Sequence, residues 1–144
     1  FSGASFTEYA DFSGASFTGN ATFSGAKFTG NATFFEAEFT QDAGFSGASF
    51  TGSTTFSKTH FHKDATFSGS NFTQGVDFSR TTFTGETSFS RVTFTQKADF
   101  SRAKFTGNSD FSGVTFTQSV DFSGAAFEGE PIFEYVLNNK TYEA

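Results

Sequence analysis

Two histidines are the residues of this sequence best suited to hold a metal ion. His60 and His62 are separated by one residue, so on an extended strand both imidazoles project from the same face. Imidazole nitrogens are frequent ligands of transition metals, and carboxylates that could join them are those of Glu38, Asp42 and Asp64. The simpler interpretation is a pair of solvated surface histidines. We therefore predict no metal site, and keep the two histidines with Asp42 and Asp64 as the candidates for one.

A second set of oxygen-bearing side chains recurs every 22 residues. Stacked carboxylates repel one another, and a hard cation such as calcium would relieve that repulsion. The alternative is a set of solvated turn residues, present for their turn propensity. We expect no cofactor, with calcium as the alternative. The set consists of Asn20, Asp42, Asp64, Glu86, Asn108 and Glu130.

A threonine column is the most regular candidate surface. Stacking it at the same interval gives a row of hydroxyl and methyl groups. In two coils, Thr93/Thr95 and Thr115/Thr117 have a Thr-x-Thr arrangement that resembles flat ice-binding solenoids. Lys27 lies in the neighbouring column, where a charge would disturb an ice lattice, and threonine is in any case a good exposed β residue. The column consists of Thr7, Thr29, Thr51, Thr73, Thr95 and Thr117.

The remaining polar residues suggest no catalytic site. There is no cysteine, and the many serines stand at repeat positions without a Ser/His/Asp set, so we predict that the chain is not an enzyme. The motif N-x-[ST] leaves glycosylation open, because threonine is common enough for chance matches. It occurs at Asn20, Asn31, Asn71 and Asn139.

The charges are modest and mixed along the chain. A net charge of −6 with nine scattered basic residues argues against nucleic-acid binding, and no apolar run is long enough for membrane insertion. We expect weak exposed ion pairs between a basic corner column and the acidic residues leading into it. These are Lys58, Arg80 and Arg102, with Asp77, Asp99 and Asp121.

Phenylalanine dictates the elements that position all these groups. It occurs 26 times, spaced alternately by five and six residues from Phe1 to Phe133, with small residues two positions before it and polar residues on either side. In an extended segment this places the ring and its small partner inside and the polar flanks outside. The spacing fits neither a helix nor a long strand, so the chain must turn a corner after each phenylalanine.

The alternation restricts equivalent coils to multiples of eleven residues. Eleven residues span at most about 36 Å, too little to enclose two rings per layer once corners are allowed for. About 22 residues give a four-sided coil with one inward phenylalanine per side, so roughly six coils would stack into four phenylalanine ladders. Phe35 is the one phenylalanine off these ladders and should face outward.

The tandem units A-[DNTSK]-F-[ST]-G resemble pentapeptide-repeat proteins. The resemblance covers residues 1–133 and implies an all-β, right-handed quadrilateral β-helix. Two features depart from that family: phenylalanine stands where many members have leucine, and every second unit carries a sixth residue, which we expect to bulge at a corner. Residues 134–144 break the pattern and are expected to form a C-terminal cap or tail.

Such a rod points to a non-catalytic structural or interaction module. We expect self-association end to end through an uncapped N-terminal coil, a place in a longer repeat chain or filament, or binding to a protein partner. The alternatives are an ice or crystal binder and, by the resemblance, a DNA mimic that binds DNA gyrase. The chain begins in mid-repeat without Met, so we expect a processed chain or a piece of a longer one. Localisation is not fixed by the sequence, and we favour an extracellular or cell-surface place.

Overall fold

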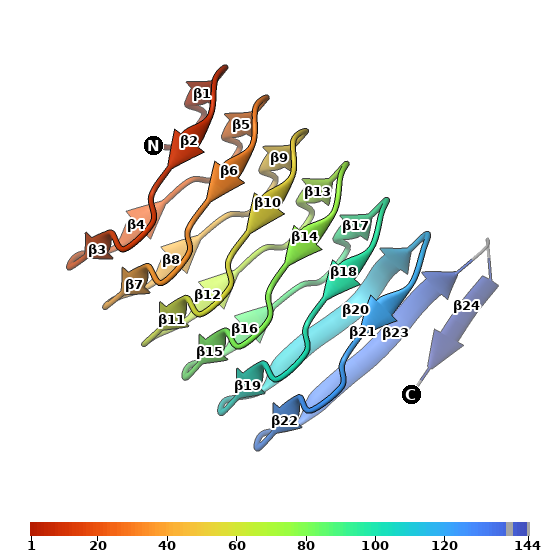
Figure 1. Ribbon diagram of the computed structural model, residues 1–144. Coiled ribbons are helices and arrows are strands. Elements are labelled where there is room, and N and C mark those ends of the chain that lie inside the picture. The colour runs from red at the N-terminus through yellow and green to blue at the C-terminus, as the bar shows by residue number, and fades with distance from the viewer. Residues whose placement is uncertain (138–139, 144) are drawn as a thin grey trace.

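Every phenylalanine of the repeat marks one side of a four-sided coil (Figure 1). The computed structural model describes residues 1–137 and 140–143, which form short strands and turns and, within that part of the chain, no helix. Consecutive coils pair in parallel with a register of 22 residues, as in Ser5↔Lys27 and Phe6↔Phe28. The predicted four-sided β-helix with 22 residues per coil is therefore confirmed.

The strands form one ladder on each side of the rod. The first side holds β4 (Ala21–Thr22), β8 (Ala43–Gly44), β12 (Ala65–Thr66) and β16 (Thr87–Ser88). The second holds β1 (Ser5–Phe6), β5 (Lys27–Phe28), β9 (Ser49–Phe50), β13 (Asn71–Phe72) and β17 (Thr93–Phe94). The third holds β2 (Ala10–Asp11), β6 (Ala32–Thr33), β10 (Thr54–Thr55), β14 (Val76–Asp77), β18 (Ala98–Asp99) and β21 (Val120–Asp121). The fourth holds β3 (Ser16–Phe17), β7 (Glu38–Phe39), β11 (His60–Phe61), β15 (Thr82–Phe83), β19 (Lys104–Phe105) and β22 (Ala126–Phe127).

Longer strands stand at the C-terminal end of the rod. β20 (Ser109–Phe116) runs along both the first and the second side and joins their ladders into one sheet. β23 (Pro131–Leu137) pairs with β20 in parallel, and β24 (Lys140–Glu143) pairs with β23 in antiparallel register. β23 is therefore paired with β20 on one edge and, from Glu134 to Leu137, with β24 on the other. The proposed boundary of a cap at residue 134 stays a prediction.

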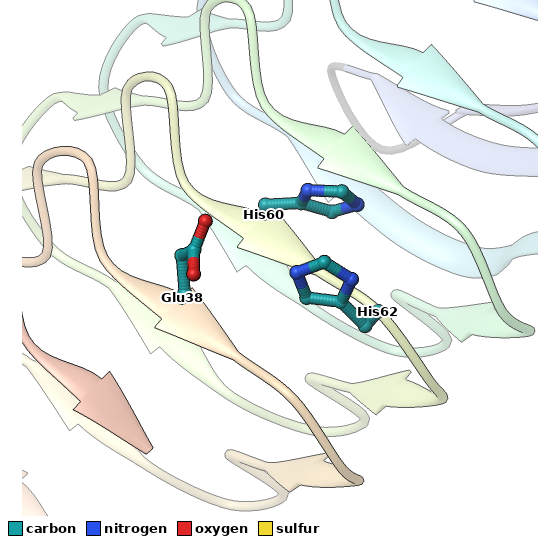
Figure 2. Close-up of side chains that lie close together, drawn as sticks. All are labelled: Glu38, His60 and His62. Atoms are coloured by element: carbon teal, nitrogen blue, oxygen red, sulfur yellow. The ribbon is translucent and has the colours of Figure 1, made fainter. Parts of the chain in front are cut away.

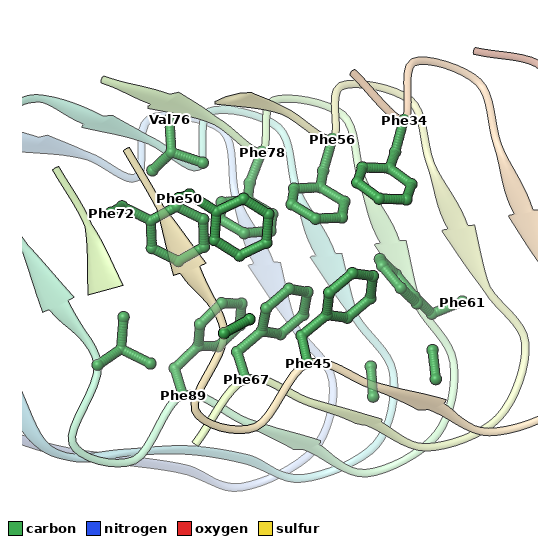
Figure 3. Close-up of a cluster of buried hydrophobic side chains, with 14 of the residues drawn as sticks. Phe34, Phe45, Phe50, Phe56, Phe61, Phe67, Phe72, Val76, Phe78 and Phe89 are labelled. Carbon is green, nitrogen blue, oxygen red and sulfur yellow. The ribbon is translucent and has the colours of Figure 1, made fainter. Parts of the chain in front are cut away.

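The core is made of stacked phenylalanine rings (Figure 3). Along each ladder, ring centroids lie 4.6 to 5.4 Å apart and ring planes are within 10° of parallel. Rings of the first and third sides meet edge to face across the centre, as do Phe45 and Phe56 at 5.3 Å and 88°. The predicted inward ladders are confirmed, and Phe35 is 37% exposed, as its position outside them predicted.

Two kinds of corner alternate around each coil. After each phenylalanine of the first and third sides the chain makes a tight turn, in which the Ala26 N–H donates to the Phe23 carbonyl at 2.9 Å. The third residue of that turn has a positive φ, which favours glycine. Seven such positions hold glycine, with φ from 66° to 71°. Five hold larger residues, with φ from 57° to 59°: Glu36, Lys58, Arg80, Arg91 and Arg102.

The other corners, after the second and fourth sides, carry the sixth residue of the longer repeat unit. At one of them Asp64 follows Lys63 between β11 and β12. These corners are wider, which leaves the ladders on either side in register, as in Phe61↔Phe83 and Ala65↔Thr87. The extra residues thus lie at two of the four corners, where the sequence analysis expected them.

Candidate functional site

The structure brings His60, His62 and Glu38 together on the fourth side of the rod (Figure 2). The buried ring of Phe61 points inward between the two histidines, which places both imidazoles on the outer face. Their rings stack with centroids 3.6 Å apart and planes at 22°. Glu38 lies in the preceding coil, in register with His60. One ligand atom from each of the three side chains lies within 4.8 Å of the others, so the three form a compact N,N,O cluster.

The environment of His60 favours its neutral form. Partial burial and, to a smaller extent, the neighbouring His62 lower the pKa of His60, whereas the Glu38 carboxylate acts in the opposite direction. The Nε2 atom of His60 also lies 3.1 Å from the Thr84 hydroxyl, which comes from the following coil. A neutral imidazole with one nitrogen engaged in a hydrogen bond is an arrangement that can present the other nitrogen to a metal ion.

Asp42 and Asp64 lie elsewhere, in the corner column of acidic and amide side chains. Each uses Oδ1 to accept a hydrogen bond from the backbone N–H of the next coil: Asp64 N–H donates to Asp42 at 3.2 Å, and Glu86 N–H donates to Asp64 at 2.9 Å. Asn20 and Asn108 accept bonds of the same kind. This column therefore joins successive coils through its own side chains. Calcium at this column stays a prediction.

The threonine column is as regular as the sequence predicted. Threonine N–H groups donate to phenylalanine carbonyls of the preceding coil, as in Thr51 to Phe28 at 2.8 Å and Thr73 to Phe50 at 2.9 Å. Its side chains are exposed, except that of Thr95, which is half-buried. The exposed Lys27 interrupts the neighbouring column. The face is thus ordered, with one charge standing beside it.

The expected ion pairs between the acidic and basic corner residues are not formed. Asp77, Asp99 and Asp121 instead accept hydrogen bonds from the backbone N–H two residues on, at 2.7 to 2.8 Å. The Ser123 hydroxyl and then its backbone N–H lower the pKa of Asp121. Within residues 1–133 the one salt bridge is Lys104–Glu128, at 3.6 Å. The prediction was wrong because the backbone N–H two residues after each aspartate is a nearer donor to its carboxylate than the end of a lysine or arginine side chain.

The potential glycosylation sites fall on different parts of the rod. Asn20 and Asn31 are exposed at wide corners, where their Oδ1 atoms accept backbone hydrogen bonds from the next coil. Asn71 is exposed on β13. Asn139 lies outside the described residues.

Comparison with known families agrees with this architecture. A family model described as "Pentapeptide repeats (9 copies)" matches five overlapping segments, at residues 1–49, 34–82, 45–93, 78–126 and 89–136. The chain belongs to the pentapeptide-repeat family. Searches of the curated proteins and of the solved structures found no match. The described residues include no helix of the length and apolarity needed to cross a membrane.

The 22-residue register between coils of this pentapeptide-repeat protein explains which site residues can be found from the sequence. His60 and His62 are found from their own spacing, whereas Glu38 and Thr84 join them only because coils repeat every 22 residues. Thr84 was missed. A separation of 24 residues would have found it, because the residue before one phenylalanine of this side then lies next to the residue after the phenylalanine of the following coil. Lys104 and Glu128 have the same separation and form a salt bridge.

Proposed function

We propose that this pentapeptide-repeat protein is a rigid, non-catalytic structural module that joins end to end with a second copy through its N-terminal coil. The family and the continuous β-helix support a structural or interaction role. The observation that carries the proposal is the surface of the first coil, which offers stacked rings and strand edges of the kind that each inner coil offers to its neighbour.

The rings of the first coil are only partly covered. Phe1 is 59% exposed, and Phe6, Phe12 and Phe17 are partly buried, whereas Phe23 in the next coil is fully buried. Inner coils also donate backbone hydrogen bonds toward the N-terminal end, as Lys27 N–H does to the Ala4 carbonyl at 2.8 Å. The equivalent N–H of Ser5 faces the N-terminal end of the rod. Apolar rings together with strand edges favour pairing with another strand-bearing surface.

A second copy supplies such a surface with matching chemistry. At the C-terminal end β24 lies along β23, so that end lacks the continuous open edge of the first coil. We therefore expect the N-terminal coils of two copies to meet, which gives a closed pair of rods and not an open filament.

The two alternative functions have weaker support. A DNA mimic needs a sustained acidic stripe. Here several carboxylates accept hydrogen bonds from backbone N–H groups of other residues, and basic residues stand between them. An ice or crystal binder needs an uncharged flat face, and Lys27 stands beside the threonine column.

The test is a measurement of molecular mass against protein concentration, by light scattering and sedimentation, on the chain with no residue added before Phe1. We expect a 15.5 kDa monomer to convert into a dimer as concentration rises. Phe1→Lys should weaken the dimer because it places a charge on the stacking surface. Phe35→Lys, the same change at an exposed phenylalanine outside the ladders, should leave it unchanged. A chain that stays monomeric at millimolar concentration, or a Phe1→Lys variant that dimerises like the parent, would overturn the proposal.

A further inference from the structure

The histidine cluster takes no part in the proposed pairing of rods. It stands on the fourth side of the second and third coils, away from the surface of the N-terminal coil, and its side chains are exposed or half-buried. The backbone beneath it is nonetheless fixed. His60 N–H donates to the Ala37 carbonyl at 3.0 Å, and His62 N–H donates to the Phe39 carbonyl at 2.9 Å. The two imidazoles are therefore anchored to the coil that carries Glu38.

The donor set is specific in its chemistry. Two imidazole nitrogens and one carboxylate oxygen suit zinc, nickel and copper, whereas calcium and magnesium require mostly oxygen ligands. The three ligand atoms already lie within 4.8 Å of one another, so small side-chain rotations would bring them to one ion. Because the Thr84 hydroxyl engages Nε2 of His60, Nδ1 is the nitrogen left for the metal, and Thr84 orients the ring from outside the site.

We propose that Glu38, His60 and His62 bind one divalent transition-metal ion, of the zinc, nickel or copper class. Water completes the coordination, since all three side chains reach the surface. The ion ties two consecutive coils together, because Glu38 belongs to one coil and both histidines belong to the next. An ion that binds the folded rod alone also raises its melting temperature, by an amount that grows with the logarithm of the free metal concentration once this exceeds the dissociation constant.

Isothermal titration of the untagged chain with zinc chloride, nickel chloride and calcium chloride tests this site. We expect one zinc or nickel ion per chain and no heat from calcium. His62→Ala should weaken zinc binding by about tenfold or more, and Glu38→Gln by a smaller factor. Glu128→Gln changes a carboxylate on the same side outside the cluster, and should bind zinc like the parent.

A second measurement separates loss of the site from loss of the fold. The variants should keep the parent circular dichroism, since the changed side chains lie outside the core. Zinc should shift the imidazole NMR signals of both histidines together in the parent chain. Zinc binding that is unchanged in His62→Ala, or zinc that leaves both imidazole signals in place, would overturn the proposal.

Discussion

At the scale of single residues, the third position of each tight turn has a positive φ, which residues other than glycine disfavour. Five of these turn positions carry a glutamate, a lysine or an arginine at positive φ, where an L-residue with a side chain is strained by about 1–2 kcal/mol. Glycine at the same positions in other coils has no such strain. Hydrogen bonds to both neighbouring coils hold these turns: Lys58 N–H donates to the Ser79 carbonyl at 3.0 Å, and Arg80 N–H donates to the Ser101 carbonyl at 2.9 Å.

Replacing Arg80 by glycine should therefore stabilise the rod. Relief of the strain is partly offset by the greater freedom of glycine in the unfolded chain, so we expect a gain of up to about 1 kcal/mol in the free energy of unfolding. Gly69→Ala is the matched reverse change, because Gly69 has φ +69° and no atom lies within 4 Å of an added Cβ. It should cost about 1 kcal/mol in urea unfolding. An equal or raised stability for Gly69→Ala would show that the turn is not strained.

At the scale of the element, the backbone of a wide corner can pack directly against the backbone of the wide corner in the preceding coil. At Gly107 an added Cβ would collide with the carbonyl oxygen of Gly85 in the preceding coil. Gln41 and Lys63 occupy the same column nearer the N-terminus, so the approach at Gly107 is particular to the glycine-lined part of this column. Glycine at position 107 is thus a requirement of close approach and not of φ.

Gly107→Ala should destabilise the rod by about 1–3 kcal/mol, since the clash is with backbone that cannot rotate away. Gly19 is the control: it holds the same column position in the first coil, with no atom within 4 Å of an added Cβ. Gly19→Ala should leave the urea midpoint within experimental error of the parent. If both variants lose the same stability, glycine content and not inter-coil contact would explain the loss.

The strands and their inward-facing residues could be predicted from the sequence more fully than the candidate site. The spacing of phenylalanine alone predicts which residues face inward, because every side of the coil repeats the same choice. The corner hydrogen bonds were not predictable, because asparagine and aspartate are favoured in turns whether or not they bridge coils. Asp42 was a candidate metal ligand by its residue type, and the hydrogen bond that its Oδ1 accepts from the Asp64 N–H was not foreseen. Glu38 could be placed beside His60 only from the 22-residue register between coils, in addition to its being a carboxylate.

At the scale of the whole molecule, stability is a sum of neighbouring coils. Phe67 is fully buried and stacks on Phe45 and Phe89, each at 4.9 Å. Phe12, in the first coil, is half-buried and stacks on Phe34 alone, at 5.0 Å. A solenoid in which each coil contacts only its neighbours should respond differently to a loss at these two places.

Phe67→Ala should lower the free energy of unfolding by about 3–5 kcal/mol, through lost burial and the cavity left between two rings. Phe12→Ala should cost less than half of that, because its ring has one stacking partner and partial exposure. Denaturant unfolding followed by circular dichroism measures both. Equal losses at the two positions would contradict a stability built from nearest-neighbour coils.

The alternation of two corner types has a consequence for how the length of such a protein can vary. Sides one and three are alike, and so are sides two and four, so half a coil superimposes on the other half by a screw operation. The natural increment of growth is therefore eleven residues: removing residues 56–66 would rotate the distal segment by half a turn while every ring still met a ring. Removing five residues would set tight turns against wide corners. Tandem duplication can thus elongate this tube in half-turn steps without altering a single contact type.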